Sequence, residues 1–154
     1  ELDNMVASHP EKAKELKRAM DQMVDELTNS PNLMKDHMPI IGTKYENPLI
    51  LNRNDASGQR GIWTQEDIYG YWNVEILEGN YNIRYKFIEP LKNAGKVMLE
   101  TKTQIIQSQM NQMPTDVIEL KNVHLKNYKG SVTPHFMNGG KSIFPLWVEF
   151  ERID

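Results

Sequence analysis

Residues 69–90, "YGYWNVEILEGNYNIRYKFIEP", alternate apolar and polar side chains on both sides of Gly79. A period of two places successive side chains on opposite faces of a strand, so one face is buried and the other is wetted. Gly79 can adopt the positive φ that a tight turn needs, and Asn80 tolerates it. We therefore expect an antiparallel hairpin packed on a second layer. Its apolar row consists of Trp72, Val74 and Ile76 before the turn and Tyr81, Ile83, Tyr85 and Phe87 after it.

The chain beyond residue 47 repeats this pattern in five further segments. A change of phase at Asn122 predicts a β-bulge, and "NGGK" at 138–141 predicts a hairpin turn. About seven or eight strands without a second helix predict a mainly β fold, an antiparallel β-sandwich that is jelly-roll-like and preceded by one N-terminal amphipathic α-helix. The segments are "PLILN" (48–52), "GKVMLETKTQII" (95–106), "DVIELKNVHLKNY" (116–128), "GSVTPHFMNGGK" (130–141) and "FPLWVEFERI" (144–153).

The N-terminal segment has the period of a helix instead. Ser8 and Glu11 have the spacing of a capping box, and Pro10 suits a first helical turn. Pro31 predicts the end of the helix within "TNSPN". We expect three parts: a helical segment at 1–30, a linker at 31–46 and the β-sandwich at 47–154. The apolar stripe of the helix is Ala13, Leu16, Met20, Met23 and Leu27.

Composition excludes several classes of function. The 154 residues carry a formal net charge of −3, which disfavours a nucleic-acid partner. No apolar run reaches the roughly 18 residues of a membrane span. The absence of cysteine removes disulfides, thiolate nucleophiles and zinc-thiolate sites. The opening "ELDNMVASHPEK" has no signal peptide and no initiator methionine, so we expect a piece excised from a longer protein.

The sequence offers little catalytic chemistry. The four histidines, His9, His37, His124 and His135, have no metal-binding spacing and are expected to be surface or packing residues. Phosphate-binding loops, dinucleotide fingerprints and the nucleophile elbow are missing as well. We therefore expect no catalytic residue, no metal ligand and no cofactor in this chain, which alone is not an enzyme.

The segment 52–72, "NRNDASGQRGIWTQEDIYGYW", is long for a connection between strands. Its aromatic rings offer flat faces to a sugar, its arginines offer forks for an anion, and its aspartate offers an acceptor for hydroxyls. One hypothesis is a ligand-binding site for a sugar or sulfated sugar. The alternative is that Trp63 plugs one end of the sandwich while Arg53 pairs with Asp55. The candidate ligand-binding residues are Arg53, Asp55, Arg60, Trp63, Tyr69 and Tyr71.

Two parts of the sequence carry a family resemblance. "ELDNMVASHPEKAKELKRAMDQMVDEL" (1–27) resembles the C-terminal end of type I sulfatases of the arylsulfatase family. "NPLILNRNDASGQRGIWTQEDIYGYWNVEILEGNYNIRYKF" (47–87) resembles the extra β-domain that follows some bacterial sulfatases, and is also similar to carbohydrate-binding sandwich modules. The resemblance covers residues 1–87. The matching positions are Glu1, Asp3, Asn4, Met5, Ala7, Pro10 and Glu11, then Asp55, Gly58, Trp63, Gly70, Trp72, Val74, Glu75, Gly79, Tyr81 and Ile83.

The resemblance implies that the parent protein is a sulfuric ester hydrolase, periplasmic or secreted, which acts on sulfated glycans. Its family uses calcium and a formylglycine made from Cys or Ser in a Cys/Ser-x-Pro-x-Arg motif. This chain lacks that motif, so the catalytic domain is expected to be a missing partner.

The chain itself would then be a bracing or glycan-binding accessory module, with a sulfated oligosaccharide as a possible ligand. The alternatives are a free-standing carbohydrate-binding module and a structural interaction domain.

Overall fold

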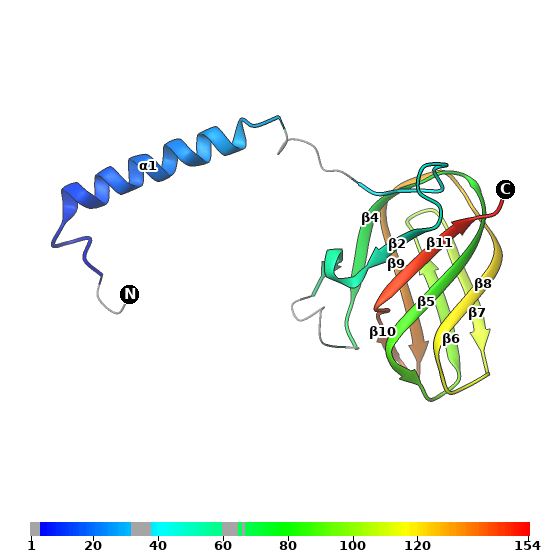
Figure 1. Cartoon of the computed structure of the whole chain (residues 1–154). Helices are drawn as coiled ribbons and strands as arrows, with labels where there is room; N and C mark the ends of the chain where they lie inside the picture. Colours follow the sequence, from blue (N-terminus) through cyan, green and yellow to red (C-terminus); the bar gives the residue numbers. More distant parts are fainter. Residues whose placement is uncertain (1–3, 32–37, 60–64, 66) are drawn as a thin grey trace. The chain divides into compact units, whose positions relative to one another are not determined.

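The computed structural model describes residues 4–31, 38–59, 65 and 67–154. The chain divides into two compact units, residues 1–37 and 38–154, and each is described by itself (Figure 1). The elements are α1 (Pro10–Thr28), β1 (Ile40–Ile41), β2 (Leu49–Asn52), the 3-10 helix η1 (Arg53–Asp55), β3 (Ser57–Gly58), β4 (Gly70–Ile76), β5 (Gly79–Leu91), β6 (Gly95–Glu100), β7 (Ile105–Met110), β8 (Thr115–Leu125), β9 (Tyr128–Asn138), β10 (Lys141–Ile143) and β11 (Trp147–Arg152).

Helix α1 is the element of the first unit. The predicted capping box is wrong, because the helix begins after His9 and no side chain caps it. The Ser8 hydroxyl donates instead to the Met5 carbonyl oxygen at 3.0 Å. The predicted end is confirmed, since Asn29 follows the last helical residue and its N–H donates back to the helix. No residue of α1 is buried, so its apolar stripe remains open within its unit.

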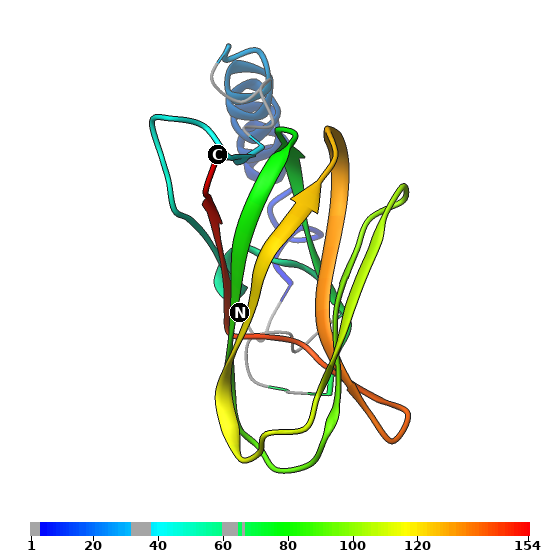
Figure 2. The same ribbon diagram turned by 90° about the vertical axis from the view of Figure 1, so that its right-hand side faces the viewer.

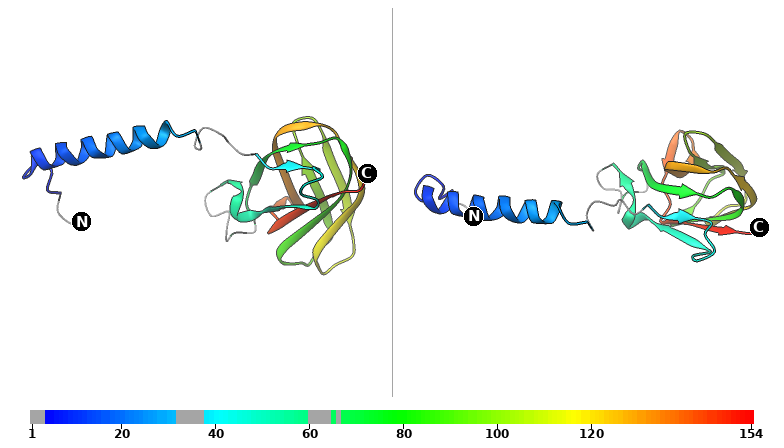
Figure 3. Two further views of the ribbon diagram at one scale, coloured as in Figure 1. Left: turned by 45° about the horizontal axis from the view of Figure 1, so that its top comes forward. Right: turned by 90° about the horizontal axis from the view of Figure 1, so that it is seen from above.

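The second unit is a β-sandwich, as predicted. One sheet has the order β1-β4-β9-β6-β7, with β3 beside β4 and β10 beside β9, and the other has the order β2-β11-β5-β8. We call them the large and small sheets. Figure 2 shows β11, β5 and β8 in one layer and β9 and β7 in the other, and the layers stay separate in the views of Figure 3.

The strand order identifies a jelly roll. Without the short strands β1, β3 and β10, eight strands remain, and we number them one to eight along the chain. The small sheet then has the order 1-8-3-6 and the large sheet 2-7-4-5. This interleaving of two Greek keys defines the jelly roll. The predicted mainly β, jelly-roll-like sandwich with one preceding helix is therefore confirmed. The parallel pairing of β1 with β4 makes the large sheet mixed.

The predicted hairpin at residues 69–90 is wrong in its pairing. Strand β4 belongs to the large sheet and β5 to the small one, so the chain crosses between layers at residues 77–78. The alternation itself is confirmed, because Trp72 on β4 and Tyr85 on β5 are both buried. The two apolar rows therefore meet across the core as facing layers instead of lying side by side in one sheet.

Two local predictions are confirmed and one turn was missed. Tyr81 pairs with Val123 but Ile83 pairs with Leu120, and Asn122 has a φ of 53°, so the bulge lies where the phase changes. Asn138 pairs with Lys141, as the "NGGK" turn requires. The segment 95–106, read as one extended piece, turns at residues 101–104 between β6 and β7.

The boundary between the parts also differs from the expectation. Strand β1 lies inside the expected linker at 31–46, and the second unit begins at residue 38.

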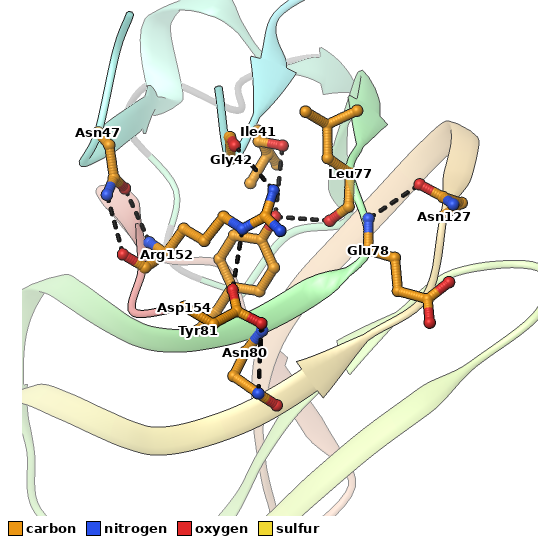
Figure 4. A network of polar contacts seen from close by, with 10 residues as sticks. All are labelled: Ile41, Gly42, Asn47, Leu77, Glu78, Asn80, Tyr81, Asn127, Arg152 and Asp154. Carbon is orange, nitrogen blue, oxygen red and sulfur yellow. Dashed lines mark hydrogen bonds and ion pairs between the residues drawn. The ribbon is translucent and has the colours of Figure 1, made fainter. Parts of the chain in front are cut away.

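A polar network fixes this entry segment to the C-terminal strand (Figure 4). The Arg152 guanidinium donates to the Gly42 carbonyl oxygen at 3.3 Å and to Asp154 at 2.9 Å. The Asn47 amide accepts from the Arg152 N–H at 2.7 Å. The hydrogen bond from Arg152 lowers the pKa of Asp154.

Candidate functional site

Arg53 lies inside the fold. It follows β2 in η1 and is 1% exposed. Its guanidinium donates to the carbonyl oxygen of Phe144 at 3.3 Å and to that of Gln65. The same group lies 5.6 Å from the centroid of the Phe144 ring. This burial goes against the predicted role of Arg53 as an anion fork, because its described bonds tie backbone segments together.

The other five candidate ligand-binding residues lie in different surroundings. Asp55 is exposed at the end of η1. Arg60 and Trp63 lie outside the described residues. Tyr69 and Tyr71 come together, with ring centroids 6.1 Å apart and planes inclined by 48°. Tyr69 is 51% exposed and Tyr71 is half-buried, so the structure brings two of the six predicted residues into a partly exposed aromatic pair.

The tyrosine pair lies on the outer face of the large sheet. The Trp72 ring points inward, where it stacks on Phe144 at 4.8 Å, and its indole N–H donates to the Asn52 carbonyl oxygen of the small sheet at 2.8 Å. Because side chains alternate along a strand, Tyr71 projects from the opposite face, and the ring of Tyr69, the residue before β4, lies beside it. Gln59 fixes the start of the strand, since its amide oxygen accepts from the Tyr69 N–H at 3.0 Å.

Strand β9 brings two polar side chains to the same outer face. Val132 is fully buried and pairs with Trp72, so alternation sends Thr133 and His135 outward. Both are nevertheless only 8% exposed. Thr133 pairs with Glu100 on β6, and the His135 Nε2 lies 3.8 Å from a Glu100 carboxylate oxygen. We call Tyr69, Tyr71, Glu100, Thr133 and His135 the sheet-face site.

Burial sets the protonation of His135. It lowers the pKa of the imidazole, while the Glu100 charge and the Thr133 backbone act in the opposite direction. Because the ordinary histidine pKa is about 6.5, the ring is neutral at pH 7. Its one N–H is engaged by the Thr133 backbone, so the other ring nitrogen remains as an acceptor. The sheet-face site thus combines two aromatic faces, an imidazole, a hydroxyl and a carboxylate. This chemistry suits a ligand rich in hydroxyl groups.

Metal chemistry has no support in the part of the chain that the structure describes. There, no three His, Asp or Glu side chains gather as metal ligands. No described helix is long and apolar enough to cross a membrane.

Sequence reasoning found the tyrosines but missed Glu100, Thr133 and His135. His135 was interpreted as a surface or packing residue. The available signal was the alternation of "VTPHF" at 132–136, which puts Thr133 and His135 on the face opposite Val132, Pro134 and Phe136. The position of Glu100 beside them depends on the pairing of β6 with β9, which no local pattern reveals.

Comparison with protein-family models, with curated proteins and with solved structures returned no match.

Proposed function

We propose that the second unit is a non-catalytic accessory module that binds a glycan on the outer face of the large sheet. The observation that carries the proposal is the partly exposed pair Tyr69–Tyr71 on the same face as the buried polar residues Thr133 and His135. Outward-facing polar groups with little exposure are held in place by their surroundings, so little conformational entropy is lost when they bind.

The chemistry of the site agrees with a sugar ligand. Tyrosine rings are large, rigid surfaces with a polar tip, which suits the mixed C–H and O–H faces of a pyranose. A few convergent polar groups then fix orientation and specificity. Here Glu100 and the free ring nitrogen of the neutral His135 supply acceptors, and the Thr133 hydroxyl supplies a donor.

The parent protein is a separate part of the proposal. We propose a bacterial sulfatase that acts on sulfated glycans in the periplasm or outside the cell, with calcium and formylglycine in its own catalytic domain. The support is the sequence resemblance of residues 1–87. Reading the gene upstream of Glu1 tests it: a Cys/Ser-x-Pro-x-Arg motif is expected in the same reading frame. A signal peptide directly upstream would instead favour a free-standing carbohydrate-binding module.

Titration calorimetry of the whole chain against a panel of neutral and sulfated oligosaccharides tests the binding function. We expect Tyr69→Ala and Tyr71→Ala each to weaken binding by about tenfold, because each removes one aromatic stacking face; for nucleic-acid bases such a face contributes roughly 1–3 kcal/mol. Tyr45→Ala is the matched control, since Tyr45 is 87% exposed and lies between β1 and β2. No heat with any glycan would contradict the proposal.

A bracing role is the second candidate, and α1 favours it. Leu16, Met20 and Met23 are each more than half exposed, although they belong to one apolar stripe. The flexible methionines suit an irregular partner surface. Coexpression of the chain with the sulfatase catalytic domain of the same gene should yield a complex that Leu16→Asp with Met20→Asp abolishes. Retention of the complex in that double variant would contradict bracing through α1.

A further inference from the structure

Strand β7 is a regular, uncharged edge of the large sheet. It pairs with β6 over six consecutive positions without a register shift, and its other side has no strand partner in the part of the chain that the structure describes. Residues 103–115 carry no charged side chain, and Ile105 is 63% exposed. A groove of about 460 Å³ lies beside Gln109 and Met110 and extends to Glu119 on β8, so the other layer leaves room next to this edge.

The other described edges of the two sheets are protected in the ways that natural proteins use, which are short length, charge and bulges. Strands β1, β3, β10 and β2 have only two to four residues. Strand β8 is long but carries Asp116, Glu119 and Lys121, and the bulge at Asn122 interrupts it. Of the edges that the structure describes, β7 alone combines length, regularity and neutrality.

The hydrogen-bond pattern shows which backbone groups of β7 face the open edge. The Thr101 N–H donates to the Gln104 carbonyl oxygen at 2.9 Å, at the turn between β6 and β7. Hydrogen-bonded and non-hydrogen-bonded pairs alternate along an antiparallel ladder. The even-numbered residues of β7 therefore bond to β6, and the odd-numbered ones direct their N–H and C=O groups to the open edge. These odd-numbered residues are Ile105, Gln107 and Gln109.

The side chains of β7 divide between the core and the outer face. Ile106 pairs with Leu99, which is buried, so the even-numbered side chains face the core, and Ile106 and Met110 pack against it. The odd-numbered side chains are exposed on the outer face. The strand therefore has one apolar side and one side that is mostly amide.

A second copy of β7 matches this edge in an antiparallel arrangement with a two-fold axis through Ser108. Ile106 then faces Met110 of the other copy on the core side. On the outer face Gln107 lies opposite Gln109 of the other copy, and the backbones of these two residues exchange hydrogen bonds. A two-fold axis through Gln107 would instead set Ile106 against Ser108. Because the strand is uncharged, no like charges face each other across the pair.

We infer that the chain forms a symmetric dimer by pairing β7 with β7 of a second copy, with Ser108 at the two-fold axis. The contact uses the same edge of both copies, so it closes at two chains. Residues that pair across strands share a face of the sheet, so the outer faces of both large sheets lie on one side of the dimer. A long glycan would then meet two sheet-face sites and bind by avidity, a consequence that rests on the proposed function.

Cysteine cross-linking of the whole chain tests the register, since the chain has no cysteine of its own. Opposed residues of a non-hydrogen-bonded pair have Cα atoms about 4.5 Å apart, which is within the range of a disulfide. Ser108→Cys should therefore give a disulfide-linked dimer under mild oxidation, seen on a denaturing gel without reductant. Gln107→Cys is the matched control. Its two copies would be diagonal neighbours roughly 7–8 Å apart, so it should give at least about fivefold less dimer.

Light scattering over a range of protein concentrations measures the assembly itself. The unaltered chain should approach twice the mass of one copy as its concentration rises. Gln107→Lys with Gln109→Lys sets like charges opposite each other and should weaken the dimer by about tenfold. Gln107→Lys with Gln109→Glu sets opposite charges there and should keep its affinity within about threefold of the unaltered chain. Ile50→Lys, on the distant edge strand β2, should leave the dimer unchanged.

Three results would overturn the inference. The first is the mass of a single copy at every concentration up to the solubility limit, which would leave the glycan-binding proposal standing. The second is a dimer that persists in the double lysine variant and disappears in Leu16→Asp with Met20→Asp, because α1 would then hold the copies together. The third is equal cross-linking of the two cysteine variants. The mass of the unaltered chain decides the question even if a variant fails to fold.

Discussion

The Arg53 guanidinium interacts with two groups of Phe144, the backbone carbonyl oxygen and the aromatic ring. The Arg53 guanidinium donates to the Phe144 carbonyl oxygen at 3.3 Å and lies 5.6 Å from the centroid of the Phe144 ring. The Phe144 ring also stacks on Trp72, with ring centroids 4.8 Å apart. The segment between β10 and β11 is thus tied to η1 and to β4, the strand that carries Tyr71.

Arg53→Ala is expected to lower the free energy of unfolding by about 3 kcal/mol, because buried carbonyl oxygens lose a charged donor and the core gains a cavity. Chemical denaturation followed by tryptophan fluorescence measures the change. Arg84→Ala is the matched control, since the Arg84 side chain is 42% exposed and its ion pairs should contribute less than about 1 kcal/mol. Equal losses in the two variants would contradict a structural role for Arg53.

Gly42→Ala tests the network drawn in Figure 4. Gly42 has a φ of +90°, and an added Cβ would overlap the Tyr81 hydroxyl oxygen, which donates to the Leu77 carbonyl oxygen at 2.6 Å. We expect a loss of roughly 2–4 kcal/mol from backbone strain and overlap combined. Gly139 has a φ of +57°, and a Cβ added there would meet no atom within 4 Å. Gly139→Ala should therefore lower the free energy of unfolding by only about 1 kcal/mol. The difference in unfolding midpoint between the two variants isolates the overlap.

The stability of the second unit should rise with pH near neutrality because of His135. Burial lowers the pKa of its imidazole below the value of about 6.5 that holds in the unfolded chain. As the pH falls through 6.5, the unfolded state therefore binds the proton more readily and the free energy of unfolding decreases. Denaturation at a series of pH values from 8 to 5 should show this slope. It should become shallower in His135→Gln and persist in His124→Gln, where the histidine is exposed.

The bulge at Asn122 makes a further prediction. Asn122 has a φ of 53°, and its N–H donates to the Asn82 amide oxygen at 3.2 Å. Asn122→Val should cost about 1–2 kcal/mol, because a β-branched residue resists positive φ. Asn122→Gly should stay within about 0.5 kcal/mol of the parent, since glycine accepts this conformation. Thermal unfolding of the pair gives the comparison, and equal stability of the two variants would rule out strain at this position.

The sequence by itself determined the local geometry of this protein. Alternation of side chains located the strands, because the side-chain period of a strand depends only on its own backbone. The phase change at Asn122 located the bulge, and the glycines at 139 and 140 located a turn, since positive φ is a property of single residues. The sequence also named Tyr69 and Tyr71 as candidates, although their pairing is seen only in the structure.

Only the tertiary structure decided which strands are neighbours. The sequence favoured pairing β4 with β5 around Gly79, yet the two strands lie in opposite sheets, because each finds a partner far along the chain: β9 for β4 and β11 for β5. That choice is made by the burial of two apolar rows against each other, which no window of sequence contains. For the same reason, only the tertiary structure shows that Arg53 is buried. It also shows that Glu100 and His135 lie beside each other, on the same sheet face as Tyr71.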